Sequence, residues 1–386
     1  EIVDETADDV SRNLLDVRHH SVNGIALEYG DDLVISLIVL CIALAVGGLD
    51  QKPEKGENDG GSGGSQQSGQ TENNTPPTTG SPVIKAKYLS LPSTTAAGNY
   101  LASVGGAADV SQTASVKSAA AVLVDLSANS VVAGKNADVK VYPASMTKVM
   151  TVLLACEKAQ DPTAKLTVTQ EMVTYHKNTG GSGMMAFVAG ESITVEDALY
   201  LASYDSDTIA CLLLAQHIAG SEEAFAQMMT ERARQIGCTN TNFVNSTGLH
   251  HTNHYTTCRE MAAIMACAMN NPAAKELLSS NRAYQVTIYN GDAIKRNGLA
   301  YTGWVNDEGR GGNNTWVGNG SNMMFIAGKT GYEDVPTSCF VTAAENTETG
   351  KKYVCVTVGR IDNSQPKVTN AESTATAKYL YHEYVG

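Results

Sequence analysis

Two stretches, Tyr142-Pro-Ala-Ser-Met-Thr-Lys-Val-Met150 and Ala327-Gly-Lys-Thr-Gly-Tyr332, decide how this 386-residue chain is understood. In the first, apolar residues recur at helical spacing behind a proline, which predicts a helix that begins there. Positions i and i+3 of a helix share a face, so Ser145 and Lys148 can hydrogen-bond. A serine becomes nucleophilic when a neighbouring base takes its proton, and a lysine serves once burial and a second cation lower its pKa. Lys329 in the second stretch is the candidate for that cation.

A third element is expected from the region between these stretches. Ser206-Asp-Thr208 stands at the start of an apolar helical pattern, and Ser206 is predicted to relay a proton between Lys148 and a leaving amine. The simpler interpretation is that Ser206 only caps the helix. Ser203-Tyr-Asp205 is a rival placement that falls before the loop.

In these motifs the chain resembles the serine D-alanyl-D-alanine carboxypeptidases, the low-molecular-mass penicillin-binding proteins of peptidase family S11. The resemblance covers about residues 119–384 and extends to Phe243-Val-Asn-Ser-Thr-Gly-Leu249 and His254-Tyr-Thr-Thr257. It implies that Ser145 is the acylated nucleophile and Lys148 its base, with Ser206 assisting proton transfer.

The resemblance also implies the substrate contacts. Lys329 and Thr330 bind the terminal carboxylate, and Gly331 lets a substrate backbone lie against a strand edge. The backbone N–H groups of Ser145 and Tyr332 form an oxyanion hole. No cofactor and no metal are expected.

Three positions depart from the family pattern. Thr208, kept here as a substrate-binding candidate, stands where the family usually has Asn, so one contact with the substrate amide is in doubt. Ser246 replaces the usual Pro. Thr369 stands where an arginine often helps to hold the carboxylate, and Arg360 or Lys367 are candidates to substitute for it.

The function that the resemblance implies is removal of the terminal D-Ala from peptidoglycan stem pentapeptides through an acyl-enzyme, with β-lactam antibiotics as covalent inhibitors. One alternative is a class A-like β-lactamase, which needs a glutamate to activate water; no Glu-x-x-Leu-Asn pattern lies between Lys148 and Lys329. Another is a non-catalytic domain that senses β-lactams or peptidoglycan. His250, His251 and His254 are expected in a surface turn, because no H-E-x-x-H pattern supports a metal site.

Strand-like patterns at both ends of the ordered sequence enclose helical ones. Strands are predicted in a hairpin at 119–132 and at 323–328, 338–344 and 353–359, and helices at 195–202, 208–219, 222–236, 257–269, 272–278 and 370–384. The fold class is therefore α/β (α+β), β-lactamase/transpeptidase-like, with an antiparallel sheet formed from both ends of the domain and an inserted helical lobe. The sequence leaves residues 284–320 unplaced.

Four segments are expected along the chain: an acidic N-terminal leader (1–32), a transmembrane or signal segment (33–49), a disordered linker (50–116) and the penicillin-binding carboxypeptidase domain (117–386). Residues 33–49 are uncharged and apolar, at the short end for a bilayer crossing. The expected location is extracytoplasmic, either anchored to the membrane at the cell envelope through this segment or secreted.

Charge and cysteines exclude other classes of function. Of the net charge of −13, most lies in residues 1–116, and the nearly balanced remainder lacks the basic face that nucleic-acid binding needs. The eight cysteines show no C-x-x-C spacing, which gives no support for a zinc or redox site. They are expected to be buried free thiols.

Overall fold

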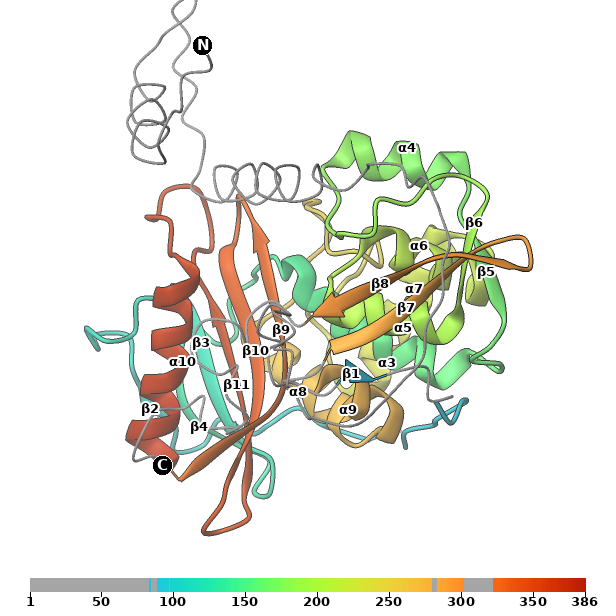
Figure 1. Ribbon diagram of the computed structural model, residues 1–386. Coiled ribbons are helices and arrows are strands. Elements are labelled where there is room, and N and C mark those ends of the chain that lie inside the picture. Colours follow the sequence, from blue (N-terminus) through green and yellow to red (C-terminus); the bar gives the residue numbers. More distant parts are fainter. Residues whose placement is uncertain (1–82, 85–88, 97, 280–282, 302–321) are drawn as a thin grey trace, which may run out of the picture. The chain divides into compact units, whose positions relative to one another are not determined.

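The computed structural model describes residues 83–84, 89–96, 98–279, 283–301 and 322–386. These residues belong to one compact unit, residues 75–386. Two sheets and a group of helices form it (Figure 1). The expected leader (1–32) and apolar segment (33–49) lie outside the described residues and stay predictions.

The larger sheet has six strands in the order β2-β4-β3-β11-β10-β9. These strands are β2 (Ala108–Asp109), β3 (Ala120–Asp125), β4 (Ser130–Lys135), β9 (Met323–Glu333), β10 (Thr337–Asn346) and β11 (Lys352–Val358). The ladders from β4 across to β9 are antiparallel, and β2 pairs with β4 in parallel. The predicted antiparallel sheet from both ends of the domain is therefore confirmed.

Successive side chains of this sheet enter two different cores, as the two-residue period of a strand requires. Leu123 packs in one core with Tyr381 of α10 (Asn370–Val385), whereas Val122 packs in the main core with residues of α8 (Cys258–Met269). Helix α10 thus covers one face of the sheet and α8 lies against the other (Figure 1).

The inserted lobe contains the remaining described helices. They are η2 (Ala144–Thr147), α3 (Lys148–Lys158), α4 (Gln170–Thr179), α5 (Val195–Tyr204), α6 (Thr208–Ala219), α7 (Glu222–Ile236) and α9 (Pro272–Leu278). Side-chain caps fix several of their starts; Asp207 accepts from the Ala210 N–H at α6, and Ser221 accepts from the Ala224 N–H at α7. Helices α6, α7 and α9 have the predicted bounds.

A second sheet accounts for part of the segment that the sequence left unplaced. Strands β7 (Ala283–Asn290) and β8 (Ala293–Tyr301) form an antiparallel hairpin. On its other edge, β7 pairs with β6 (Glu191–Thr194) and in parallel with β1 (Val83–Ile84), and β6 pairs with β5 (Lys165–Thr167). Short strands far apart in the sequence carry little local signal, because their hydrogen bonds depend on partners that the local pattern does not identify.

The prediction that residues 50–116 form a disordered linker is wrong for the C-terminal end of this segment. Val110 and Val116 are buried in the core beneath α10, and Leu89 and Ala102 are buried in the main core. Val110 and Val116 each stand alone among small and polar residues, so no periodic pattern marks this end of the segment. Long-range backbone pairing, such as that of β2 with β4, orders it instead.

The cysteines of the described residues follow the prediction. Cys156, Cys211, Cys238, Cys258, Cys267, Cys339 and Cys355 are free thiols, and all are buried. Burial raises the pKa of the Cys211 thiol to about 12, which keeps it protonated and inert at neutral pH.

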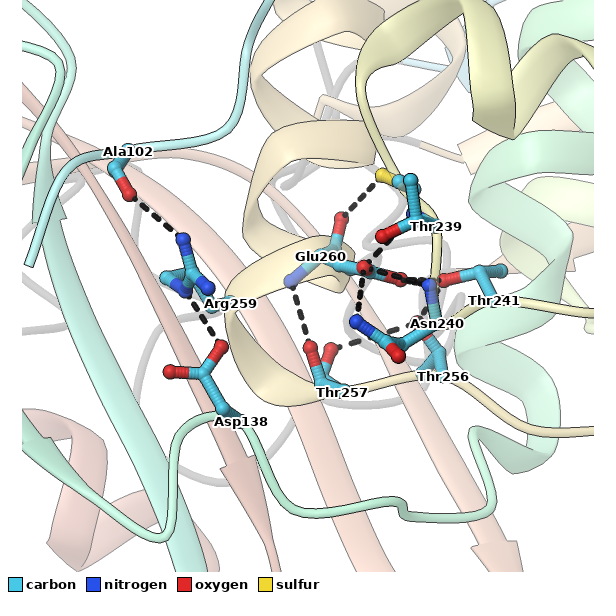
Figure 2. Close-up of polar contacts among 10 residues, drawn as sticks. Ala102, Asp138, Thr239, Asn240, Thr241, Thr256, Thr257, Arg259 and Glu260 are labelled. Carbon is cyan, nitrogen blue, oxygen red and sulfur yellow. Dashed lines mark hydrogen bonds and ion pairs between the residues drawn. The ribbon is translucent and has the colours of Figure 1, made fainter.

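A buried carboxylate fixes the start of α8 to the chain that leads into it (Figure 2). Glu260 accepts from the backbone N–H of Thr239 (2.9 Å) and of Asn240 (2.8 Å) and from the hydroxyl of Thr241 (2.5 Å). Its own N–H donates to the side chain of Thr257, the N-cap. The connection from α7 is therefore held against the first turn of α8.

The same turn also holds the approach to Ser145. Arg259 donates to the carboxylate of Asp138 (2.6 Å) and to the carbonyl of Ala102 (3.1 Å), as Figure 2 shows. Just before the helix, Thr256 and Val141 exchange two backbone hydrogen bonds of 2.8 and 2.9 Å. The segment leading to the predicted nucleophile is thus set by the N-terminus of α8.

Replacing Glu260 by Ala should lower the free energy of unfolding by about 3 kcal/mol, because the buried Thr241 hydroxyl and the backbone N–H groups of Thr239 and Asn240 lose their acceptor at once. The comparison is Glu231→Ala on α7, whose side chain is 59% exposed and which should change stability by less than about 0.5 kcal/mol. Chemical denaturation followed by circular dichroism measures both. Equal midpoints for the two variants would contradict the role given to Glu260.

Candidate active site

Ser145 lies in a strained turn. It belongs to η2, which leads directly into α3, so the predicted helix begins as a tight 3-10 turn. Ala144 has a φ of +44°, a region that residues with a side chain rarely occupy. Gly248, with a φ of +83°, packs against the Ala144 carbonyl so closely that a Cβ there would collide with it. A glycine at 248 is therefore a condition for this turn.

The hydrogen bond expected between Ser145 and Lys148 is present. Lys148 Nζ donates to Ser145 Oγ over 3.0 Å and also to the carbonyl of Thr247. The lysine is 1% exposed. Burial lowers its pKa, and the surrounding carboxyl groups of Asp207, Glu333 and Glu222 oppose that shift. A neutral amine at this position can take the proton of Ser145.

Lys329 brings a second amine to the same site from β9. It is 3% exposed and donates to the carbonyl of Thr330 over 3.0 Å. Burial first, and then the neighbouring ammonium of Lys148, lower the pKa of Lys329 to about 7. The effect runs from Lys148 to Lys329, and the predicted lowering of the Lys148 pKa by Lys329 stays a prediction.

Strand β9 packs directly against the turn Ala144–Thr147, which carries the predicted nucleophile Ser145 and is called the nucleophile turn below. A Cβ at Gly331 would stand 2.8 Å from the backbone N of Ser145 and 2.7 Å from Cys339 Sγ, closer than such atoms approach. β9 is the last strand of its sheet. Thr330 is half-buried and Tyr332 is 58% exposed, so this part of the strand is accessible beside Ser145.

Ser206 has an unusual backbone and a hydroxyl without a partner. Its φ is +57°, and its Oγ is buried with no hydrogen-bond partner among the described residues. The N-cap of α6 is Asp207, so the interpretation of Ser206 as the helix cap is wrong. Burial raises the pKa of Asp207 to about 7. The rival Ser203 donates to the carbonyl of Leu277 within the core.

Thr208 is bound to a neighbouring loop. Its hydroxyl accepts from the N–H of Ser182 over 3.0 Å, and its own N–H donates to the Ser182 carbonyl over 2.9 Å. The Ser182 hydroxyl donates to the carbonyl of Ser206, and Gly183 packs against Asp207 with no space for a Cβ. The contact of Thr208 with a substrate amide stays a prediction.

The candidates for a substitute arginine contact the residue that follows β9. Arg360 donates from Nε to the carbonyl of Asp334 over 2.8 Å, and Lys367 forms an ion pair of 3.7 Å with the Asp334 carboxylate. Thr369 caps α10 in a capping box with Glu372. None of these contacts involves the lysine pair.

A loop for which the sequence predicted no role completes the site. Asn245 Oδ1 accepts from the Gly248 N–H (2.7 Å) and from the Thr247 hydroxyl (3.2 Å), and Asn245 Nδ2 donates to the Leu249 carbonyl (2.9 Å). This closed turn presents the Thr247 carbonyl to Lys148. The available signal was the Asn and Gly of the family-like stretch, which indicated a turn but no partner.

The expectation that His254 lies in a surface turn is wrong. It is 1% exposed, and its Nε2 lies 2.7 Å from the hydroxyl of Thr147. The Val244 N–H donates to Nδ1, so Nε2 carries the proton and donates to Thr147. Burial lowers the pKa of His254 to about 3, which keeps the ring neutral. The ring thus joins the nucleophile turn to the neighbouring loop.

Gly248→Ala should abolish covalent labelling of the protein by a fluorescent penicillin, because the added methyl group displaces the Ala144 carbonyl and with it Ser145. Gly291→Ala is the matched control, since Gly291 also has a positive φ (+60°) but open space around it. Labelling on gels and the melting temperature of each variant separate the loss of site from the loss of fold. Wild-type labelling of a folded Gly248→Ala would contradict the packing described.

The chain is similar in sequence to known D-alanyl-D-alanine carboxypeptidases. The chain is 29% identical over 269 residues to D-alanyl-D-alanine carboxypeptidase DacF of Bacillus subtilis, covering 68% of this chain and 62% of that protein. It is 35% identical over 158 residues to D-alanyl-D-alanine carboxypeptidase DacC of Escherichia coli, 39% of each chain. The chain thus spans less than two thirds of the length of these relatives.

Solved structures share the fold at low identity. The Streptomyces K15 DD-transpeptidase is 20% identical with a TM-score of 0.58, over 69% of this chain and 97% of that one. D-alanyl-D-alanine carboxypeptidase from Mycobacterium tuberculosis is 20% identical with a TM-score of 0.55, over 70% and 92%. The family model for D-alanyl-D-alanine carboxypeptidase matches residues 107–360. The chain therefore belongs to the D-alanyl-D-alanine carboxypeptidase family, peptidase family S11.

Proposed function

We propose that this chain is a serine D-alanyl-D-alanine carboxypeptidase that removes the terminal D-Ala from peptidoglycan stem pentapeptides. The observation that carries the proposal is the 3.0 Å contact between Ser145 Oγ and a buried Lys148, with Lys329 and the accessible edge of β9 beside it. Family membership supports the same reaction. The activity of the whole protein is a proposal, because the chain spans less than two thirds of the length of these relatives.

Acylation begins when neutral Lys148 takes the proton of Ser145 and Oγ attacks the carbonyl of the penultimate D-Ala. The developing oxyanion is stabilised by the backbone N–H groups of Ser145 and Tyr332, each donor contributing about 2.7–4 kcal/mol in comparable sites. Ser206 relays the proton from Lys148 to the leaving amine. The C–N bond breaks, free D-Ala leaves, and an ester remains on Ser145.

Deacylation uses water in place of the leaving amine. The same base accepts a proton from water, hydroxide adds to the ester, and Ser145 recovers its proton as the shortened peptide departs. A β-lactam opens its ring on Ser145 by the same first step. An amine that takes the place of water would accept the acyl group at the same site.

Substrate orientation follows from charge and from the strand edge. Lys329 and Thr330 hold the terminal carboxylate, and the peptide backbone lies along β9, where Gly331 leaves room. Thr208 is retained as a candidate contact for the substrate amide. No cofactor and no metal take part in the proposed mechanism.

The proposed place of action is outside the cytoplasmic membrane, where peptidoglycan lies. Attachment through residues 33–49, or secretion after cleavage, is part of the proposal and rests on the apolar sequence alone. Within the part of the chain that the structure describes, no helix combines the length and apolarity needed to cross a bilayer.

Ser145→Ala should abolish both labelling by a fluorescent penicillin and release of D-Ala from a pentapeptide, while the melting temperature stays near that of wild type. Ser364→Ala, at an exposed serine, is the control and should behave as wild type. Mass spectrometry locates the adduct and quantifies released D-Ala.

Each other outcome points to a different function. Labelling that survives in Ser145→Ala would remove Ser145 as nucleophile. Rapid turnover of the penicillin by wild type would favour a β-lactamase. A stable adduct without D-Ala release from the pentapeptide would favour a non-catalytic sensor of β-lactams or peptidoglycan.

A further inference from the structure

Ser246, which replaces the family's usual proline, contacts a carboxylate from another helix. The Ser246 N–H donates to Glu222 Oε1 over 2.7 Å, and its hydroxyl lies 3.0 and 2.9 Å from the two oxygens of that carboxylate. A proline at this position has no N–H and no hydroxyl to donate. A chain with proline at this position could therefore make none of these contacts.

The residues around Ser246 lead directly to the reacting groups. The Ser246 carbonyl accepts from the hydroxyl of Thr151 on α3 over 2.7 Å. The next carbonyl, that of Thr247, accepts from Lys148, and the residue after it, Gly248, packs against the nucleophile turn. A displacement at Ser246 is thus passed to the base within one residue.

Glu222 faces this loop, although its position in α7 offers it another partner. An acidic side chain in the first turn of a helix can interact with the unpaired N–H groups there. Ser221 already accepts the Ala224 N–H as N-cap. The Glu222 carboxylate instead accepts three contacts from Ser246, whereas the adjacent Glu223 is exposed.

We infer that Glu222 is a positioning residue for acylation: it holds Ser246, and through it the Thr247 carbonyl, against Lys148. The inference rests on the proposed function. The hydrogen bonds of Glu222 go to Ser246 and not to Ser145 or Lys148; it acts by fixing the acceptor that orients the Lys148 amine toward Ser145. Glu222 is half-buried, and a carboxylate that is partly removed from water is costly unless it is hydrogen-bonded, so the position of Glu222 depends on Ser246 as well.

The test measures the second-order rate of acylation by a fluorescent penicillin, with the melting temperature of each full-length variant. Glu222→Ala should acylate 10- to 100-fold more slowly, the effect expected for a misplacement of about 1 Å. Glu222→Gln keeps an acceptor for Ser246 and should remain within about threefold of wild type. Glu223→Ala, one residue along the same helix, should match wild type.

A double-mutant cycle separates positioning from a general effect on stability. Ser246→Ala removes the hydroxyl donor and should slow acylation about two- to fivefold in the wild-type background. It should add little in Glu222→Ala, because the two residues act through one contact. If Glu222→Ala does not fold, the Ser246→Ala and Glu222→Gln rates decide: a wild-type rate for Ser246→Ala overturns the inference.

The remaining outcomes are also decisive. Wild-type acylation by a folded Glu222→Ala overturns the inference, as does a Glu222→Gln rate no better than that of Glu222→Ala. Losses that multiply fully in the double variant remove the coupling between the two residues. A wild-type protein that penicillin does not label would instead overturn the proposed function itself.

Discussion

The site depends on one interaction, the burial of Lys148 against the hydroxyl of Ser145. Moving an ammonium group out of water is costly, so burial favours the neutral amine that can act as a base. Burial and the charge of Lys148 lower the pKa of Lys329 on β9 in turn, while carboxylates near Lys148 oppose the lowering of its own pKa. The fold must supply the free energy that keeps both lysines out of water, and the surrounding contacts show how it does so.

The nucleophile turn is held between two backbones that approach it without side chains. Gly331 of β9 packs against the backbone nitrogen of Ser145, and Gly248 packs against the carbonyl oxygen of Ala144. A strained residue such as Ala144 persists only where its surroundings determine its conformation. The loop with Gly248 is fixed by Asn245 and Glu222, so residues from the sheet and from the helical lobe meet at one serine.

Much of this arrangement could be predicted, and the failures have a common physical cause. Strands β3, β4, β9, β10 and β11 of the larger sheet and helices α6, α7 and α9 follow from periodic apolar patterns, and the Ser145–Lys148 contact follows from helical spacing. The second sheet, the ordered residues before 117 and the burial of His254 depend on contacts between distant segments. The same holds for Thr247, whose role is a backbone carbonyl and leaves no trace in side-chain chemistry. Residues 206–208 were identified as a motif, but their link to Ser182 was not visible in the sequence.

The most direct test of the central claim is a titration of Lys148 itself. Protein labelled with carbon-13 at lysine Cε, with Lys148→Arg used to assign the resonance, gives the pKa of this side chain by NMR. The account predicts that Lys148 titrates well below the ordinary lysine value of 10.5. A Lys148 resonance that titrates near 10.5 in the folded protein would contradict it, because a lysine that stays charged at neutral pH cannot take the proton of Ser145.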